Sequence, residues 1–145
     1  MIAREKTIIT VEAKINAQVE KVWNLWTDPK HIIRWNTASD DWYTPKAEND
    51  LRVGGKFLSR MEARDGSSGF DFTGKYNKIE LHKSIDYTIE DGRKVHITFD
   101  NVGNGTKVSE SFESEQTNTI EMQHAGWQAI LDNFKHYAET SGFKA

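Results

Sequence analysis

Glu110 is the side chain in this sequence whose surroundings most clearly suggest chemistry, because it is an acid on an otherwise apolar strand face. Val108 and Phe112 flank it two residues away on either side, so all three side chains point the same way in a strand. A buried carboxylate without a partner is costly, and burial would raise its pKa. Glu110 could therefore orient a ligand or transfer a proton inside a pocket. An equally open interpretation places it at the rim of the sheet, in solvent.

The other reactive side chains form no recognisable motif. The sequence has no cysteine, which removes thiol nucleophiles and zinc–thiolate sites. Its five histidines lack the spacing of a zinc motif, and no serine has the context of a nucleophile elbow. Gly54-Gly55 precedes a predicted strand rather than a helix, so it is not expected to hold phosphate. We therefore expect no metal and no cofactor, and a binding protein rather than an enzyme.

The N-terminal third predicts one strand followed by two short helices. Residues 7–15 alternate apolar and polar side chains, as a half-buried strand does. From Val19 the apolar spacing becomes helical and continues to Trp26. Asp28 is a good N-cap and Pro29 suits a first helical position, so a second helix should begin there. The two helices would form a V.

The middle of the sequence predicts an antiparallel meander. Residues 36–56 are polar and read as a long loop or a short edge strand. Short turn-forming links then separate a series of predicted strands, which forces neighbouring strands to run antiparallel. These strands are expected at 56–63, 69–79, 83–90, 93–100 and 106–113.

The pairing of two hairpins can be predicted from the faces of their strands. For the first, a three-residue loop 90–92 with Gly92 at positive φ pairs Tyr87 with Val95 and Ile85 with Ile97, which matches apolar with apolar. For the second, a two-residue turn at Asn104-Gly105 pairs Ile97 with Phe112 and Phe99 with Glu110. In both cases the apolar residues share one face.

Residues 119–138 predict a long C-terminal helix with one apolar side. That side needs a large apolar partner, which only the sheet can supply. Its members are Met122, Gly126, Trp127, Ile130, Leu131, Phe134 and Tyr137.

Composition indicates one domain spanning residues 1–145 and limits its partners. A length of 145 residues suits a single core. The N-terminus lacks the apolar run of a signal peptide and no stretch is long enough for a membrane span, so we expect a cytoplasmic protein. A net charge of −3 without a basic stripe argues against nucleic acid. Five Trp, seven Phe and four Tyr must line a core or a cavity.

In combination, several motifs resemble the SRPBCC or START-like superfamily of Bet v 1 type, and within it the group named for the activator of Hsp90 ATPase homologue 1. The resemblance covers nearly the whole sequence. It implies an α+β helix-grip fold, in which six or seven antiparallel strands curl around the C-terminal helix and two short helices close one end. The motifs are Val22-Trp23, Thr27-Asp28-Pro29, Trp35, Gly54-Gly55 with Phe57, Tyr87-Thr88, Thr106 with Val108, and Gly126-Trp127 with Leu131.

The resemblance and the pocket argument together predict binding of a small hydrophobic or amphipathic molecule, such as a lipid, polyketide or aromatic compound, between sheet and helix. Two alternatives stay open: a polyketide cyclase or hydrolase using Glu110, and a modulator of an Hsp90-type chaperone ATPase. We expect a monomer or a weak homodimer. The predicted ligand-binding residues are Trp42, Met61, Phe70, Phe72, Tyr76, Tyr87, Glu110, Trp127, Ile130 and Phe134.

Overall fold

The computed structural model describes residues 7–140, which form a seven-stranded antiparallel sheet and three helices. Residues 1–6, which carry part of the prediction about a signal peptide, lie outside the described part. No helix within residues 7–140 is long and apolar enough to cross a membrane. In chain order the elements are β1 (Ile8–Ile15), α1 (Val19–Thr27), α2 (Pro29–Trp35), β2 (Trp42–Asn49), β3 (Lys56–Ala63), β4 (Gly69–Glu80), β5 (Ser84–Ile89), β6 (Lys94–Val102), β7 (Gly105–Glu113) and α3 (Ile120–Thr140).

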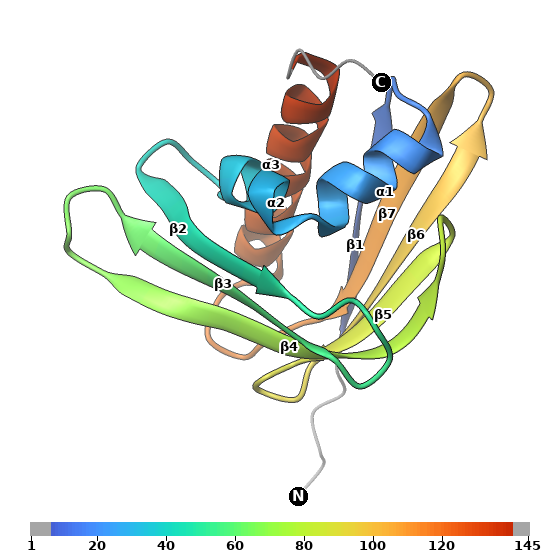
Figure 1. Ribbon diagram of the computed structural model, residues 1–145. Coiled ribbons are helices and arrows are strands. Elements are labelled where there is room, and N and C mark those ends of the chain that lie inside the picture. Colours follow the sequence, from blue (N-terminus) through green and yellow to red (C-terminus); the bar gives the residue numbers. More distant parts are fainter. Residues whose placement is uncertain (1–6, 141–145) are drawn as a thin grey trace, which may run out of the picture.

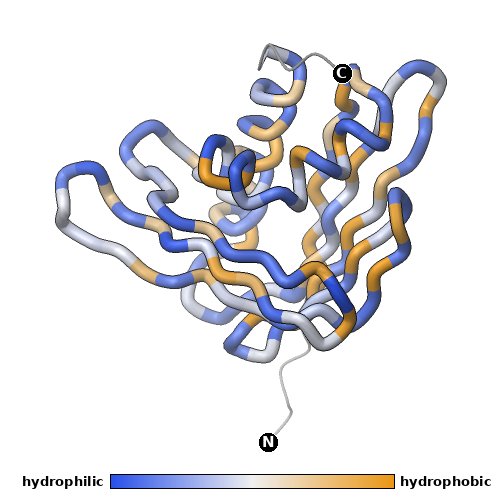
Figure 2. Tube along the Cα trace, viewed as in Figure 1, coloured by the Kyte–Doolittle hydropathy of each residue, from blue (hydrophilic) through white to orange (hydrophobic). Residues whose placement is uncertain are grey.

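The sheet curls around α3, as the predicted helix-grip fold requires, and it has seven strands rather than six (Figure 1). Its order is β1-β7-β6-β5-β4-β3-β2, so β1 and β2 form the two edges. Helix α3 packs along β1, while α2 packs on β2. Hydrophobic and hydrophilic stretches alternate along the chain (Figure 2). The buried apolar side chains of the strands and of the helices pack into one core between the concave face of the sheet and the helices. Of residues 36–56, predicted as a long loop or a short edge strand, Trp42–Asn49 form the edge strand β2 and the rest are loop up to the start of β3.

The V of two short helices is confirmed, and its corner is fixed by Asp28. The Asp28 side chain accepts a hydrogen bond from the backbone N–H of Lys30 at 3.0 Å, and Pro29 is the first residue of α2. At the other end of α2, the Trp35 indole N–H donates to the Leu25 carbonyl at 2.9 Å. This buried bond ties α2 to α1 and fixes the angle at which both helices close one end of the sheet.

The predicted hairpin between β5 and β6 is confirmed. Gly92 has φ +95°, the left-handed conformation that a bulge of this type requires. Tyr87 pairs with Val95 and Ile85 with Ile97, as the matching of apolar faces predicts.

The predicted pairing of β6 with β7 is wrong by two residues. Val102 pairs with Gly105, so the turn is Gly103-Asn104, and Ile97 lies opposite Glu110. Gly103 has φ +72° and takes the turn position that the prediction gave to Asn104. A shift of two residues keeps every side chain on its face, so face matching could not distinguish the two registers.

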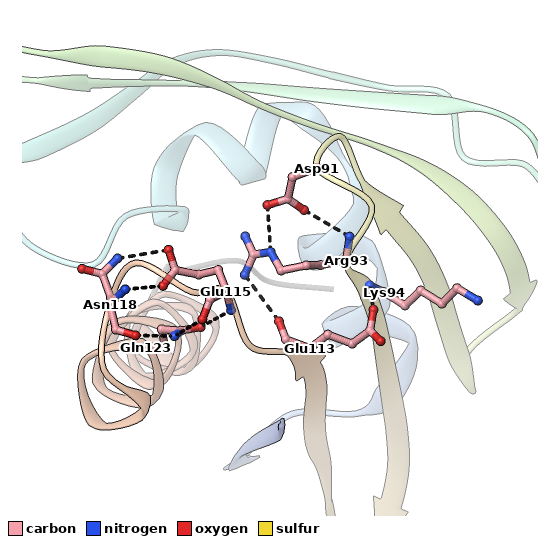
Figure 3. Close-up of polar contacts among 7 residues, drawn as sticks. All are labelled: Asp91, Arg93, Lys94, Glu113, Glu115, Asn118 and Gln123. Atoms are coloured by element: carbon pink, nitrogen blue, oxygen red, sulfur yellow. Dashed lines mark hydrogen bonds and ion pairs between the residues drawn. The ribbon is translucent and has the colours of Figure 1, made fainter. Parts of the chain in front are cut away.

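The apolar side of α3 is as predicted except at its N-terminal end. Leu131 and Phe134 are fully buried, but Met122 is 62% exposed and the neighbouring Gln123 is buried instead. Figure 3 shows the reason: the loop before α3 folds back onto Gln123. The Gln123 side chain accepts a bond from the N–H of Glu115 at 2.9 Å and donates to the carbonyl of Asn118 at 2.9 Å. A polar side chain is buried here because it satisfies backbone groups of that loop.

Candidate functional site

A cavity of about 310 Å³ lies between the concave face of the sheet, α3 and the two short helices, and it is partly open to solvent. Eight of the ten predicted ligand-binding residues line it. Strands β3, β4, β5 and β7 and helix α3 contribute them, which shows that one face of the sheet and one side of α3 converge on the same space. They are Met61, Phe70, Phe72, Tyr76, Tyr87, Glu110, Trp127 and Ile130.

Trp42 and Phe134, the other two predicted residues, do not line the cavity. Phe134 is fully buried in the core, where its ring lies 4.8 Å from that of Trp26 and 4.9 Å from that of Trp35. Trp42 begins the edge strand β2 and its ring contacts that of Phe70 at 5.9 Å. Trp42 therefore packs against Phe70, a residue of the cavity wall, and Phe134 packs against α1 and α2.

Glu110 is 4% exposed and lies on the inner face of β7, so it belongs to the cavity and not to the outer rim of the sheet. Its neighbours across the strands are Ile97 and Val11. Within residues 7–140 its side chain has no hydrogen bond or ion pair. Burial raises the pKa of Glu110 from 4.5 to about 8. At neutral pH it is therefore a protonated carboxyl group that can donate a hydrogen bond or a proton into the cavity.

Two tyrosines on neighbouring strands differ in their hydrogen bonding. The Tyr76 hydroxyl donates to the Asn49 side chain at 2.6 Å, and Asn49 in turn donates to the Thr27 carbonyl at 2.7 Å. This chain of bonds links β4, β2 and α1. The Tyr87 hydroxyl has no hydrogen bond to a described residue; burial raises its pKa above the ordinary value, and the charge of Glu110 raises it further. Among the described residues, Tyr87 and Glu110 are therefore two buried cavity groups whose side chains have no hydrogen-bond partner and can bind a ligand.

Arg93 lines the cavity and was not predicted. Its Nε donates to the Asp91 carboxylate at 2.8 Å, and its Nη1 donates to the Glu113 carbonyl at 3.4 Å. The register predicted for the β5–β6 hairpin already places Arg93 on the inner face, two residues before Val95. The alternation of faces was therefore the pattern that could have identified it.

Phe57 also lines the cavity. Along β4, Gly74 lies between the aromatic residues Phe72 and Tyr76 on the same face, and the Phe57 ring fills the space where Gly74 has no side chain. A Cβ on Gly74 would lie 2.5 Å from the Phe57 ring. The glycine therefore makes room for a side chain of the protein itself. The cavity begins beyond that ring, which also contacts Tyr76 and Tyr87.

We expect Gly74→Ala to lower the free energy of unfolding by about 2 kcal/mol, because the Phe57 ring must move into the cavity or the strands must separate. The matched control is Gly126→Ala in α3, where an added Cβ meets nothing within 4 Å. That change should raise stability by about 1 kcal/mol, the difference in helix propensity. Urea denaturation of both variants measures the effects. Destabilisation of equal size by the two substitutions would contradict this account of Gly74.

The family model described as activator of Hsp90 ATPase homolog 1-like protein matches residues 16–139. The chain is also similar to the solution structure of an AHSA1-like protein from Aeromonas hydrophila, with 46% identity over 95% of this chain and 96% of that one and a TM-score of 0.90. A protein from Cytophaga hutchinsonii is 47% identical over 94% and 96% of the two chains, with a TM-score of 0.80. None of the curated proteins compared matches the chain.

The fold extends to more distant proteins. A crystal structure of a protein from Chromobacterium violaceum is 23% identical over 91% of this chain and 96% of that one, with a TM-score of 0.81. Similarity at that level of identity concerns the fold alone.

Proposed function

Because this chain belongs to the family of activator of Hsp90 ATPase homolog 1-like proteins, and because its sheet and α3 enclose a largely apolar cavity, we propose that it binds a small hydrophobic or amphipathic molecule there. The observation that carries the proposal is the cavity itself. Its volume of about 310 Å³ lies at the lower end of the range for small-molecule pockets. Burial of apolar surface would supply most of the binding free energy, and Glu110 and Tyr87 would orient the ligand.

Native mass spectrometry of the freshly purified protein is the first test, since a retained ligand adds its mass to that of the chain. Fluorescence titration with lipids, flavonoids and aromatic polyketides is the second. Trp26, Trp35 and Trp127 line the cavity, so a bound ligand should change their emission. We expect saturable binding with one molecule per chain.

A matched pair of variants on α3 makes this test specific to the cavity. Ile130→Trp places a larger side chain in the cavity wall and should weaken binding at least tenfold. Met122→Trp adds the same side chain to an exposed position of the same helix and should leave binding unchanged. Equal affinity of the two variants, or no saturable binding by the wild-type protein, would refute the proposal.

A reaction on the bound molecule, of cyclase or hydrolase type, is the second candidate. The observation that favours it is the pKa of Glu110, which at about 8 leaves a proton available for general acid catalysis at pH 7. Under this alternative, Glu110→Gln would stop the conversion of a bound polyketide while the substrate still binds. Mass spectrometry of the incubated ligand would detect the change.

The family name also supports a partner among Hsp90-type chaperones. Stimulation of the ATPase of the cognate chaperone by the purified protein would establish that role. The predictions of a cytoplasmic location and of a monomer or weak homodimer stay predictions.

A further inference from the structure

The Tyr87 hydroxyl and the Glu110 carboxyl both face the cavity without a hydrogen bond to a described residue, and they differ in what they can offer a ligand. The Tyr87 hydroxyl can donate or accept a hydrogen bond without changing its charge. It would serve an uncharged ligand on its own. The Glu110 carboxyl adds something that a hydroxyl or an amide cannot, namely a full negative charge. In a buried site that charge requires a cation beside it.

The described residues supply no such cation to Glu110. Arg93 is the basic side chain among the residues lining the cavity, and it is engaged by Asp91 and by the Glu113 carbonyl. It precedes Ile97, the strand partner of Glu110, by four residues, or about 13 Å along the strand. When Glu110 is ionised, the cation paired with it therefore comes from outside the described residues.

The remaining walls suit a positive charge. Eight of the residues that line the cavity are aromatic, and they come from the sheet, from both short helices and from α3. The faces of aromatic rings carry negative electrostatic potential and attract cations, most strongly when the site excludes water. Three of the eight are tryptophans, Trp26, Trp35 and Trp127, and indole is the strongest such partner where one of its faces is open to the cavity.

From this arrangement we infer that the molecule held in the cavity is a lipophilic amine, whose cationic nitrogen pairs with Glu110 while its apolar body lies against the aromatic walls. The inference rests on the proposed function and names the chemical class of its ligand. A neutral ligand would use the hydroxyl of Tyr87 or the protonated carboxyl of Glu110 and would gain nothing from a charge on Glu110, and an anionic ligand would be drawn to Arg93.

The titratable groups around Glu110 allow a pH test. Tyr87 and Tyr76 line the same cavity from β5 and β4, and burial raises the pKa of both. Glu48, from β2, lines the cavity but is 60% exposed and paired with Lys46 at 2.8 Å. Arg93 lines the cavity and is paired with Asp91. Glu110 therefore controls the charge of the cavity between pH 6 and 8, and a cation binds only its deprotonated form.

Isothermal titration calorimetry with three probes that share one body tests the inference: naphthylmethylamine, naphthylmethanol and naphthoate. We expect the amine to bind most tightly at pH 8. Because about half of Glu110 is ionised at pH 8 and about one hundredth at pH 6, its affinity should fall about 50-fold between these pH values. At pH 7, binding of the amine should release about one proton, which titrations in buffers of different ionisation enthalpy will detect.

Glu110→Gln should weaken the amine at least tenfold more than it weakens the alcohol. If Glu48→Gln removes the preference for the amine and Glu110→Gln does not, the inference is overturned. Equal affinities of amine and alcohol, or tightest binding by naphthoate, would also overturn it while leaving the proposed function intact. Absence of binding by all three probes at pH 8 would count against both.

Discussion

The free energy of unfolding of the wild-type protein is expected to fall by about 3 kcal/mol between pH 5 and pH 8 through Glu110 alone. The pKa of this carboxyl is about 8 in the folded protein and 4.5 ordinarily. Between these values the folded state keeps the proton and the unfolded state loses it. Because the folded state then binds more protons, stability must decrease as the pH rises, and it levels off above pH 8.

Glu110→Gln should abolish that decrease, because glutamine has nearly the same shape and no charge to bury. Urea denaturation of both proteins at pH 5, 6, 7 and 8 measures the difference. Glu62→Gln is the control: Arg60, and then Tyr43, lower the pKa of Glu62, so it is ionised throughout this range and its loss should not alter the slope. Parallel stability curves for the wild type and Glu110→Gln would show that Glu110 is not buried as described.

Phe134→Ala is expected to lower the free energy of unfolding by about 4 kcal/mol. Phe134 is fully buried, and its ring packs edge-on against Trp26 of α1 and Trp35 of α2. The rigid anchors around it, such as the bond from Asn133 to the Trp35 carbonyl at 2.8 Å, limit how far the helices can collapse into the space left behind. An unfilled cavity adds to the lost burial of the ring.

Ile130→Ala, one turn earlier on α3, is the comparison for this effect. Ile130 is half-buried and faces the existing cavity, so its truncation enlarges a space that is already present. We expect a loss of about 1 to 2 kcal/mol. Thermal or urea denaturation at pH 6 suffices for both variants. If Phe134→Ala lowers the free energy of unfolding by no more than Ile130→Ala does, Phe134 is not at the centre of the core.

Much of the fold could be predicted because local rules and global packing agree. Asp28 and Pro29 define the corner between α1 and α2, and Gly92 defines one hairpin together with its pairing. The β6–β7 pairing could not be predicted, since alternation repeats every two residues and Gly103 and Gly105 both suit a turn. Periodicity likewise assigned Met122 to the buried side of α3, because it contains no information about the loop that covers Gln123.

Most of the strand residues of the candidate site could be predicted, whereas its residues from α1, α2 and the β5–β6 turn could not. Side chains on the inner faces of the strands, Glu110 and Tyr87 among them, follow from alternation once the strands are known. Trp26 and Trp35 were missed as cavity residues because a helical stripe does not distinguish a side chain packed in the core from one that borders a space. Arg93 was missed because a charged residue beside a turn is ordinarily in solvent.

The β6–β7 hairpin also determines which changes in length this protein can tolerate. Deletion or insertion of two residues in β7 before Glu110 would slide the carboxyl along the same side of the sheet, still facing inward. A single-residue change would rotate it to the outer surface and bring a serine inward, since Ser109 and Ser111 flank it. Relatives that retain an acid inside should therefore differ by even numbers of residues within β7, between the turn and that acid.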